Sequence, residues 1–471
     1  MTRSQLITLL VLVTIICLGS ALLLLPERRV TALQPERLVQ FAPSQVREVV
    51  VEPAGGPAQR LLRTGPDRWE IELPAQGEGA AVRWPAATER VHGFLRILDR
   101  LRAAPAEAPG AAPALWATIV AEGGERVAIG LPAAPLGGRA VVQAGPDRAS
   151  ARPLVTTDEL NRLLVGPGLS GWLDPRVFAG IEGQPVEVAV LSGGDEMRLV
   201  RSGGGWRIGS PFEAAAEASL VQELLVGLQA LPFTAADASV AAERSGAPAA
   251  TSVRIVTEAR RPAAGGEVVA EQATHELRTL GAPDAGGRIG ATVEILESAA
   301  EGSEATAAGP LHVELDASRL TALVRQPAFY LARRVLHGTA GDIHGFVFQY
   351  PSGAERRWDR VGEGWAVAGA PVPPAGAAAL DNLAALLTET PAPIAAWAGE
   401  AGAPGAEPVA EIACLGFGGA EIGRLALSVA PPPAAAADQR QHAVAITAGV
   451  ARYYPPEAVV EILRWIVDSE P

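Results

Sequence analysis

The sequence predicts an α+β protein in which an N-terminal transmembrane helix precedes three repeated modules of antiparallel hairpin strands packed with amphipathic helices. Three observations support this prediction: a long uncharged N-terminal run, a hairpin pattern that recurs three times, and a leucine stripe at helical spacing after each hairpin. Strands joined by hairpins and followed by single helices are typical of the α+β class, and they argue against a parallel, doubly wound sheet.

The N-terminal run covers residues 6–25, LITLLVLVTIICLGSALLLL, and contains no charged side chain. At ~1.5 Å per residue, a helix of this length spans about 30 Å, which is the thickness of a bilayer's hydrocarbon core. A cleaved signal peptide is the alternative, because Gly19, Ser20 and Ala21 could precede a cut. The run exceeds the ~7–15 apolar residues of a signal core, so we predict residues 1–35 to be an uncleaved, single-pass membrane anchor.

Arginines flank the apolar run on both sides, with Arg3 before it and Arg28 and Arg29 after it. A simple charge count would keep the bulk of the chain in the cytoplasm, but long domains are translocated largely regardless of charge. The signal-like position of the run favours export. We therefore expect a protein of the bacterial inner membrane whose C-terminal bulk lies in the periplasm.

The repeated hairpin consists of a strand, a glycine turn, a second strand, another turn, and a third strand that opens on a tryptophan. The tryptophans are Trp69, Trp206 and Trp365. Apolar residues recur at every second position, as at Val186 and Val188, and this is the period of a strand with one buried face. The module boundaries predicted from this repetition are 36–178, 179–340 and 341–471.

A stripe of apolar residues at helical spacing follows each hairpin. The three stripes are Val91, Phe94, Leu95, Leu98 and Leu101; Leu220, Leu224, Leu228 and Leu231; and Leu380, Leu383 and Leu387. Further strands then close each copy, and short helices are predicted at 158–164, 317–324 and 456–465. Four alanine- and proline-rich stretches lack apolar bulk and are predicted to be surface loops. They cover residues 103–114, 259–266, 299–309 and 430–437.

Several of these segments resemble a bacterial family, the domain of unknown function numbered 4340. The segments include SQVREVVVEP at 44–53, LGAPDAGG at 280–287 and VELDASRL at 313–320. The resemblance implies a single-pass membrane protein with repeated copies of the domain. Some members are encoded beside permease and ATPase subunits of ABC-type, gliding-related export systems, which implies a periplasmic accessory role. The family supplies no catalytic residues.

Composition excludes several function classes. The chain of 471 residues has 52 acidic and 39 basic side chains and a net charge of −13, which argues against nucleic acid as a partner. Every basic residue is arginine, so a P-loop lysine and a Schiff-base lysine are both excluded. Cys17 and Cys414 are too few for a disulfide framework or a cysteine-rich zinc site.

Motif searches predict no catalytic, cofactor-binding or metal-ligating residue. Ser170 lies in an incomplete nucleophile elbow, because Trp172 replaces its last glycine. His275 lacks a second histidine at helical spacing, and the His344 region is interpreted as a turn beside a strand. Cys414 is interpreted as a small buried hydrophobe.

For several other side chains a structural interpretation is favoured over a binding role. His92 is interpreted as a solvent-side residue, and the arginine pairs at 28–29, 333–334 and 356–357 as solvated faces rather than as sites for anionic lipid or acidic partners. The three tryptophans could stack on sugar rings or lipid tails. Because they recur at one place in every copy, we interpret them as core residues.

These observations favour a binding or scaffold protein over an enzyme. We expect it to bind the bilayer through its N-terminal segment and to engage an ABC-type permease or another envelope protein, with no cofactor and no nucleic acid. Two alternatives stay open: an envelope hydrolase that acts on glycan or peptide through carboxylates, and a solute-binding protein with a pocket between modules.

Overall fold

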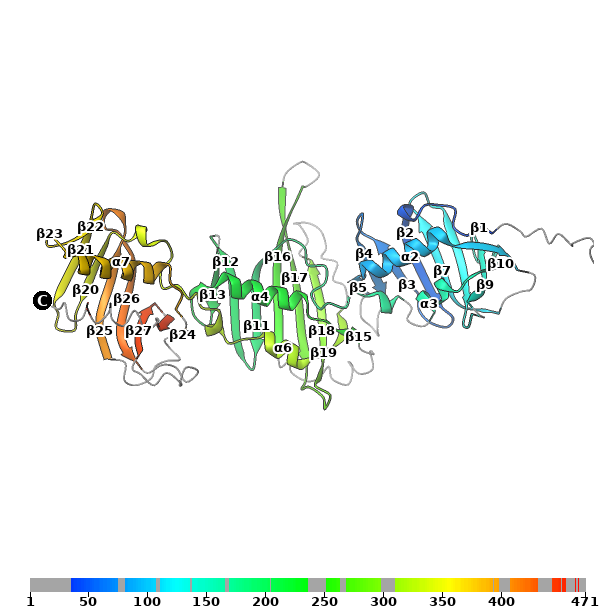
Figure 1. The fold of residues 1–471 in the computed structure, drawn as a ribbon. Helices are drawn as coiled ribbons and strands as arrows, with labels where there is room; N and C mark the ends of the chain where they lie inside the picture. Colours follow the sequence, from blue (N-terminus) through cyan, green and yellow to red (C-terminus); the bar gives the residue numbers. More distant parts are fainter. Residues whose placement is uncertain are drawn as a thin grey trace, which may run out of the picture. The chain divides into compact units, whose positions relative to one another are not determined.

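The computed structural model describes most of the chain after residue 34. The described residues are 35–74, 81–106, 111–135, 138–165, 169–203, 205–235, 251–262, 268–297, 310–392, 394–397, 407–430, 443–449, 451–454, 462 and 465. The chain divides into two compact units, residues 1–174 and 175–471. The first unit holds one antiparallel sheet and the second holds two (Figure 1).

The sheet of the first unit has ten strands in the order β1-β6-β10-β9-β8-β7-β2-β3-β4-β5. The strands are β1 (Glu36–Arg37), β2 (Val46–Pro53), β3 (Gln59–Arg63), β4 (Trp69–Leu73), β5 (Val82–Pro85), β6 (Arg102–Pro105), β7 (Pro113–Ala121), β8 (Arg126–Pro132), β9 (Arg139–Gly145) and β10 (Arg152–Thr157). The helices are η1 (Pro43–Gln45), α2 (Thr88–Arg100), α3 (Glu159–Leu164) and η2 (Ser170–Trp172).

The second unit begins with a nine-stranded sheet in the order β14-β13-β12-β11-β16-β17-β18-β19-β15. Its strands are β11 (Gln184–Ser192), β12 (Asp195–Ser202), β13 (Gly205–Ser210), β14 (Ala214–Ala216), β15 (Thr234–Ala235), β16 (Thr251–Pro262), β17 (Val268–Leu280), β18 (Arg288–Glu297) and β19 (Leu311–Asp316). Helices α4 (Ala218–Gln229), α6 (Ala317–Leu323) and η3 (Pro327–Tyr330) accompany it.

The third sheet also has nine strands, in the order β23-β22-β21-β20-β25-β26-β27-β28-β24. Its strands are β20 (Gly345–Gln349), β21 (Glu355–Val361), β22 (Gly364–Val367), β23 (Ala370–Pro371), β24 (Ile394–Trp397), β25 (Glu407–Leu415), β26 (Glu421–Ala430), β27 (Ala443–Ala448) and β28 (Ala451–Tyr454). Its helices are η4 (Ala340–Asp342), α7 (Pro374–Thr388) and η5 (Phe417–Gly419).

All three sheets share one strand order. Four strands meander to one edge, a helix follows, and a short strand then pairs at the other end of the sheet, where β1 adds a further edge strand in the first sheet only. Four further strands return across the sheet, and the first of them pairs with the first strand of the copy: β7 with β2, β16 with β11, and β25 with β20. The helix after the fourth strand is α2, α4 or α7 (Figure 1).

The predicted fold class is wrong. The protein is mostly β, with 49% of residues in strands and three antiparallel sheets, rather than α+β. The predicted transmembrane helix at 6–25 lies outside the described residues. Among the residues that the structure describes, no helix is long and apolar enough to cross a membrane. Leucine stripes identify helices strongly, whereas many of the strands carry alanine and arginine and give a weak periodic signal.

Three of the predicted loops contain strand residues, since residues 113–114 also begin β7 and residue 430 ends β26. Residues 103–105 belong to β6, which pairs with both β1 and β10. Residues 259–262 end β16 and pair with β17. Backbone hydrogen bonds hold these strands, so they need no bulky side chains. Residues 299–309 and 431–437 lie outside the described residues.

The helical predictions are confirmed where the structure describes them. Helix α2 buries Val91, Phe94 and Leu98, and α7 buries Leu380, Leu383 and Leu387 completely. Helix α4 buries Leu224 and Leu228, while α3 and α6 match the predicted short helices. The third short helix, at 456–465, is described only at residues 462 and 465. The three module boundaries stay a prediction.

The repeated tryptophans are core residues, as predicted. Trp69, Trp206 and Trp365 are 5%, 9% and 3% exposed. Each lies at the start of the third strand of its copy, in β4, β13 and β22. These side chains therefore pack inside their own sheets and offer no ring face for a ligand.

Candidate functional site

A solvent-open groove runs along helix α2 in the first unit. Its volume is about 780 Å³. The lining residues are Pro43, Glu89, His92, Leu95, Arg96, Asp99 and Arg100. Six of them come from α2, and Pro43 comes from the short helix η1, so the groove follows the outer face of α2 where η1 lies beside it.

The periodicity of α2 fixes which side chains face the groove. Val91, Phe94 and Leu98 are buried, and the Phe94 ring packs edge-on against Trp172 with 5.2 Å between the ring centroids. With 3.6 residues per turn, burial of this stripe turns His92 and Arg96 toward solvent. The helix ends at Arg100, and the C-cap residue Leu101 that follows has an extended backbone and a buried side chain.

The opposite wall is held by a local hydrogen bond. Gln45 Oε1 accepts from the backbone N–H of Ala42 at 2.9 Å, which closes the turn of η1 and places Pro43 beside α2. Arg63 donates to the backbone oxygen of Ser44 and fixes η1 from the side of β3. The η1 wall is therefore held by two bonds between side chains and the backbone, and neither bond uses a side chain that lines the groove.

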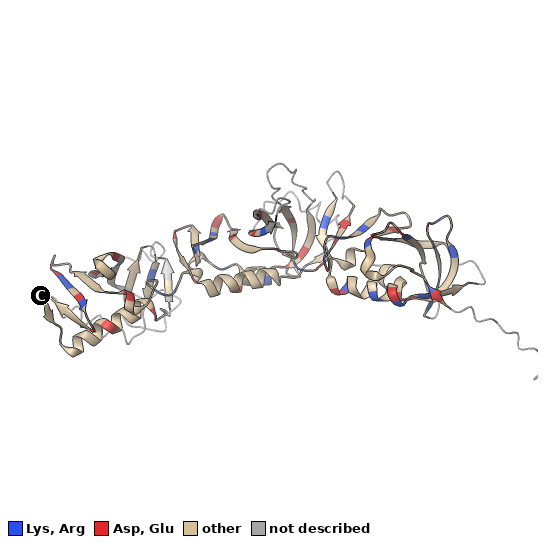
Figure 2. Cartoon of the chain, turned by 90° about the horizontal axis from the view of Figure 1, so that it is seen from above, with Lys and Arg blue, Asp and Glu red and all other residues tan. Residues whose placement is uncertain are grey.

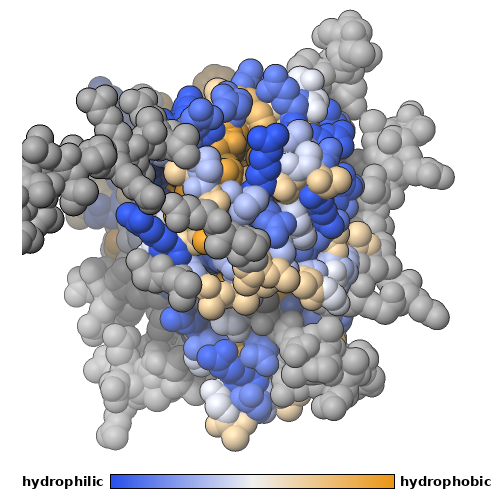
Figure 3. All heavy atoms as spheres, turned by 90° about the vertical axis from the view of Figure 1, so that its right-hand side faces the viewer, coloured by the Kyte–Doolittle hydropathy of each residue, from blue (hydrophilic) through white to orange (hydrophobic). Residues whose placement is uncertain are grey.

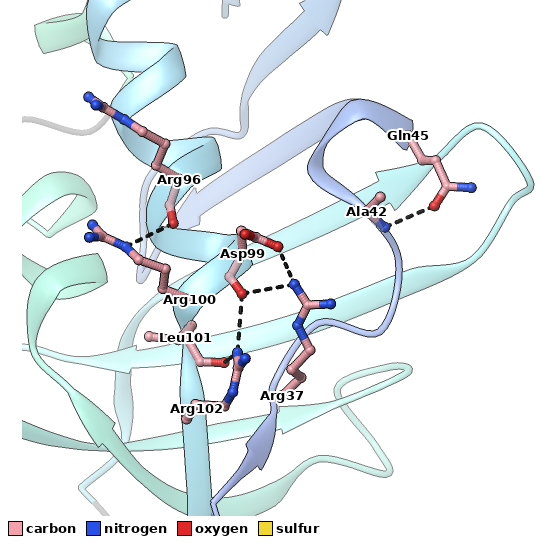
Figure 4. Close-up of polar contacts among 8 residues, drawn as sticks. All are labelled: Arg37, Ala42, Gln45, Arg96, Asp99, Arg100, Leu101 and Arg102. Carbon is pink, nitrogen blue, oxygen red and sulfur yellow. Dashed lines mark hydrogen bonds and ion pairs between the residues drawn. The ribbon is translucent and has the colours of Figure 1, made fainter.

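At the C-terminal end of α2, two arginines converge on one residue (Figure 4). Arg37, from β1, donates to the Asp99 carboxylate and also to the Asp99 backbone oxygen at 3.1 Å. Arg102, from β6, donates to the same backbone oxygen at 3.1 Å. The Arg37 and Asp99 side chains are 42% and 48% exposed, so the ion pair contributes little to stability and can rearrange.

Arg96 and Arg100 are one helical turn apart. Arg100 Nε donates to the Arg96 backbone oxygen at 3.3 Å, and Figure 4 shows both guanidinium groups extending away from Asp99. In the part of the chain that the structure describes, neither guanidinium has a carboxylate within ion-pair distance. The groove therefore presents two cations without a described counter-charge.

Arginines on the sheets are arranged differently. Across β2, β3 and β4, Arg60 lies between Glu48 at 2.7 Å and Glu72 at 3.3 Å, and Arg83 also contacts Glu72 at 3.0 Å. The pKa of Arg60 is raised, chiefly by its hydrogen bond to Glu48. Cross-strand ladders of this kind neutralise their own arginines. Arg60 and Arg83 are thus neutralised by carboxylates of the same sheet, whereas Arg96 and Arg100 of the groove have no described carboxylate partner.

The repetition of the fold supplies an internal comparison for α2. Helix α4 (ASLVQELLVGLQ) and helix α7 (PAGAAALDNLAALLT) occupy the same place in their copies, and each has one charged residue, an acid. Helix α2 has five charged residues, Glu89, Arg90, Arg96, Asp99 and Arg100. Figure 2 shows the contrast, with several blue and red segments on α2 and an almost uncoloured α7. The fold itself does not require a charged helix here.

The groove combines charged and apolar lining residues. Figure 3 shows hydrophilic side chains surrounding small hydrophobic areas on one face of the first unit. Leu95 and Pro43 contribute half-buried apolar atoms to the groove, and His92 stands at its side with Nε2 3.9 Å from Asp67. Chemically, this combination suits a ligand that has carboxylates and a little apolar surface.

The residues considered from the sequence are not brought together. His92 is exposed, as predicted, and is the one among them that lines the groove. Cys414 is fully buried, and burial raises its pKa to about 12, which confirms it as an unreactive hydrophobe. His275 is buried on β17, where burial lowers its pKa to about 4. Among the described residues, no cluster of histidine, cysteine, aspartate and glutamate could hold a metal ion.

The remaining predicted positions have structural roles or lie outside the description. Asp342 accepts from the backbone N–H of Thr339 at 2.7 Å and from its hydroxyl at 2.9 Å, and these bonds lower the pKa of Asp342. The His344 ring packs edge-on against Phe417. Arg357 pairs with Asp359. Residues 28–29, the first arginine pair, lie outside the described residues.

Sequence reasoning missed Arg37, Arg96, Arg100 and Arg102 as a group. Arg37 and Asp99 are 62 residues apart, so only the folded chain brings them together. One signal was available: Arg96 and Arg100 have i, i+4 spacing opposite the apolar stripe, and the two equivalent helices contain no arginine.

Comparison with known proteins gives no relative. No family model, no curated protein and no solved structure matches this chain. The resemblance to the domain of unknown function stays a prediction from the sequence.

Proposed function

We propose that this chain is a membrane-associated, non-catalytic binding or scaffold protein of the bacterial envelope, and that the groove on α2 is its contact surface. The observation that carries the proposal is the difference among three equivalent helices. The same strand order occurs in all three sheets, but only α2, in the first, carries a set of arginines. A charged surface that the fold does not need is best explained by a partner.

The groove supports binding better than chemistry. Its charged groups are exposed, and Asp99 is engaged by Arg37, whereas catalytic carboxylates are usually held in water-excluded sites. Exposed arginines at a protein surface suit the recognition of carboxylates and add specificity and association rate. The family resemblance adds an ABC-type permease or another envelope protein as the class of partner.

Photo-crosslinking in intact cells of the source bacterium tests the binding function. A photoreactive residue replaces Glu89, which lines the groove, or Glu223, which is exposed on the equivalent helix α4. We expect a discrete adduct with another protein from position 89 and none from position 223. The proposal fails if neither position gives an adduct, or if both give the same set.

Membrane association has its own test. The full chain and a variant lacking residues 6–25 are expressed in cells, and membranes are washed with alkaline carbonate. We expect the full chain in the membrane pellet and the shortened chain in the supernatant, because the deleted run supplies the apolar surface that the bilayer would bury. Recovery of the full chain in the supernatant would remove this part of the proposal.

The alternative functions give different results. An envelope hydrolase would release products from peptidoglycan or envelope peptides on incubation with the purified chain. A solute-binding protein would show a ligand-dependent rise in melting temperature in a metabolite screen. Either result without a crosslinked partner would overturn the scaffold function.

A further inference from the structure

We propose that the groove between α2 and η1 binds an acidic segment of a partner protein in extended conformation, with two carboxylates two residues apart facing Arg96 and Arg100. This inference rests on the proposed binding function and adds the chemistry of the partner.

The charge at this end of α2 is opposite to that of the chain as a whole. Four arginines lie in or beside the last two turns of α2: Arg37, Arg96, Arg100 and Arg102. Asp99 lies in the same part of the helix, where Arg37 binds its carboxylate. Glu89 lies at the other end of the helix, more than two turns away. Although the whole chain has a net charge of −13, the C-terminal half of α2 thus has a local excess of cations. This local charge would attract an acidic segment.

The spacing of the two free cations defines the ligand. Residues at i and i+4 on a helix have Cβ atoms about 5–6 Å apart. In an extended chain, alternate residues point to the same side and are about 6.6–7 Å apart. An acid-x-acid pattern therefore places one carboxylate against Arg96 and the next against Arg100, and each arginine can donate two parallel hydrogen bonds.

The groove also offers a small apolar contact. Leu95 and Pro43 are half-buried and lie beside the cations. In an extended ligand, the residue two positions beyond the acid pair points to the same side as the carboxylates. If the ligand runs antiparallel to α2, so that its first acid faces Arg100 and its second faces Arg96, an apolar side chain at that position lies on the N-terminal side of Arg96, where Leu95 lies. The pattern then becomes acid-x-acid-x-apolar.

Helix stability alone does not account for these arginines. Cations in the last turn of a helix interact favourably with the helix dipole, which would explain Arg100. Arg96 lies a turn earlier, where the effect has faded, and α4 and α7 have no cation in their last turns. The arginines of α2 are thus a feature of this copy.

A protein segment fits the groove better than an anionic membrane does. A flat anionic surface that approached Arg96 and Arg100 would also approach Asp99 and Glu89, which line the same groove. A narrow extended chain can pass between these acids and reach the arginines alone. Like charges held opposite each other cost binding free energy, so the flat surface is disfavoured.

Fluorescence anisotropy with the full chain tests the inference. The probe is a dye-labelled Gly-Glu-Gly-Glu-Gly-Leu-Gly peptide, and its counterpart has glutamine in place of both glutamates. We expect the acidic peptide to bind about tenfold more tightly than the glutamine peptide at 50 mM salt, and most of this difference to disappear at 500 mM salt.

Variants locate the binding. The double variant Arg96→Gln with Arg100→Gln is expected to bind the acidic peptide about tenfold more weakly, and each single variant about threefold more weakly. Arg90→Gln, an exposed arginine on another face of α2, serves as the matched control and should change affinity less than about twofold. Asp99→Asn removes the competing carboxylate and should strengthen binding about two- to threefold.

Several outcomes would overturn the inference: no peptide binding up to 1 mM, equal binding of both peptides, or an equal effect of Arg90→Gln and the double variant. Sedimentation with vesicles that contain 30% phosphatidylglycerol tests whether the surface binds an anionic lipid instead. If vesicles bind through Arg96 and Arg100 and the acidic peptide does not, the surface recognises lipid. A partner adduct from position 89 without peptide binding would leave the proposed function standing and remove this inference alone.

Discussion

The indole of Trp365 donates a hydrogen bond from Nε1 to Asp381 Oδ1 at 2.9 Å, which ties strand β22 to helix α7. Arg360 donates to the same carboxylate oxygen at 2.8 Å, and its guanidinium lies 4.9 Å from the Trp365 ring centroid. The Trp365 ring also stacks on Phe346, with 5.4 Å between the ring centroids. One carboxylate on the helix thus satisfies a buried indole and an arginine of the sheet.

Removal of this carboxylate should destabilise the third sheet. Asp381→Ala leaves the buried Trp365 N–H without its acceptor, at a cost of about 1–2 kcal/mol. Asp381→Asn keeps an acceptor oxygen and should cost about half as much. Urea unfolding followed by near-UV circular dichroism measures both variants. Glu363→Ala, an exposed position in the same sheet, is the control, and an equal effect there would refute the assignment.

The thiol of Cys414 should be unreactive until the third sheet opens. Its side chain is fully buried, and burial raises its pKa to about 12. At pH 8 the thiolate is then about 10⁻⁴ of the population, against roughly a quarter for an ordinary thiol. In a Cys17→Ser variant, we expect iodoacetamide to label Cys414 only in denaturant.

A position on the same sheet gives the comparison for this labelling. Ala370 is exposed in β23, and an Ala370→Cys variant that also lacks both native cysteines should be labelled without denaturant. Labelling of Cys414 at the same rate as this control would show that the sheet opens freely in the native protein.

The parts of the fold that follow from local patterns could be predicted from the sequence. Helix α2 was predictable because burial of Val91, Phe94 and Leu98 on one face produces a helical period. The tryptophans were recognisable as core residues because every copy needs one. Strand β14 is three alanines and has no alternation to detect, and it forms because β13 pairs with it.

Long-range contacts account for what could not be predicted. One of the two partners of β6 is β10, some fifty residues later in the chain, and no turn signal joins them. In the candidate site, Arg37 meets Asp99 only because β1 pairs with β6. Neighbouring positions in the sequence give no signal of this contact, so the sequence could not predict that Arg37 and Asp99 would pair.

The backbone at Gly183 should tolerate no side chain. Its φ of +79° is in the left-handed region, and a Cβ there would lie 2.3 Å from the backbone oxygen of Glu258 on β16. Gly183→Ala therefore combines conformational strain of about 1 kcal/mol with a shift of the backbone, for a total of about 3 kcal/mol. Hydrogen exchange of the β11 and β16 amides measures the loss.

Gly287 separates the two causes of this loss. It directly precedes β18 of the same sheet with a φ of +74°, and a Cβ there would meet no atom within 4 Å. Gly287→Ala should therefore cost only the strain, about 1 kcal/mol. If the two variants are equally destabilised, the close approach of Gly183 to Glu258 has no energetic effect.

The buried His275 should make the second sheet sensitive to mild acid. The side chain is 2% exposed on β17, between Ile255 of β16 and Ile295 of β18, and its Nδ1 has no hydrogen-bond partner among the described residues. Burial lowers its pKa to about 4, whereas the unfolded chain has the ordinary value of about 6.5. The folded state therefore binds the proton less readily than the unfolded state.

The sign of the pH dependence follows from this difference. Above pH 6.5 histidine is neutral in both states and the stability is complete; as the pH falls from 6.5 toward 4, the unfolded state gains a proton and the folded state does not. The loss approaches about 3 kcal/mol near pH 4. His275→Leu should remove this part of the pH dependence in urea unfolding, while His337→Gln, at an exposed histidine, should keep it. If the His275→Leu variant loses stability between pH 6.5 and 4 as steeply as the native chain, the acid sensitivity arises elsewhere.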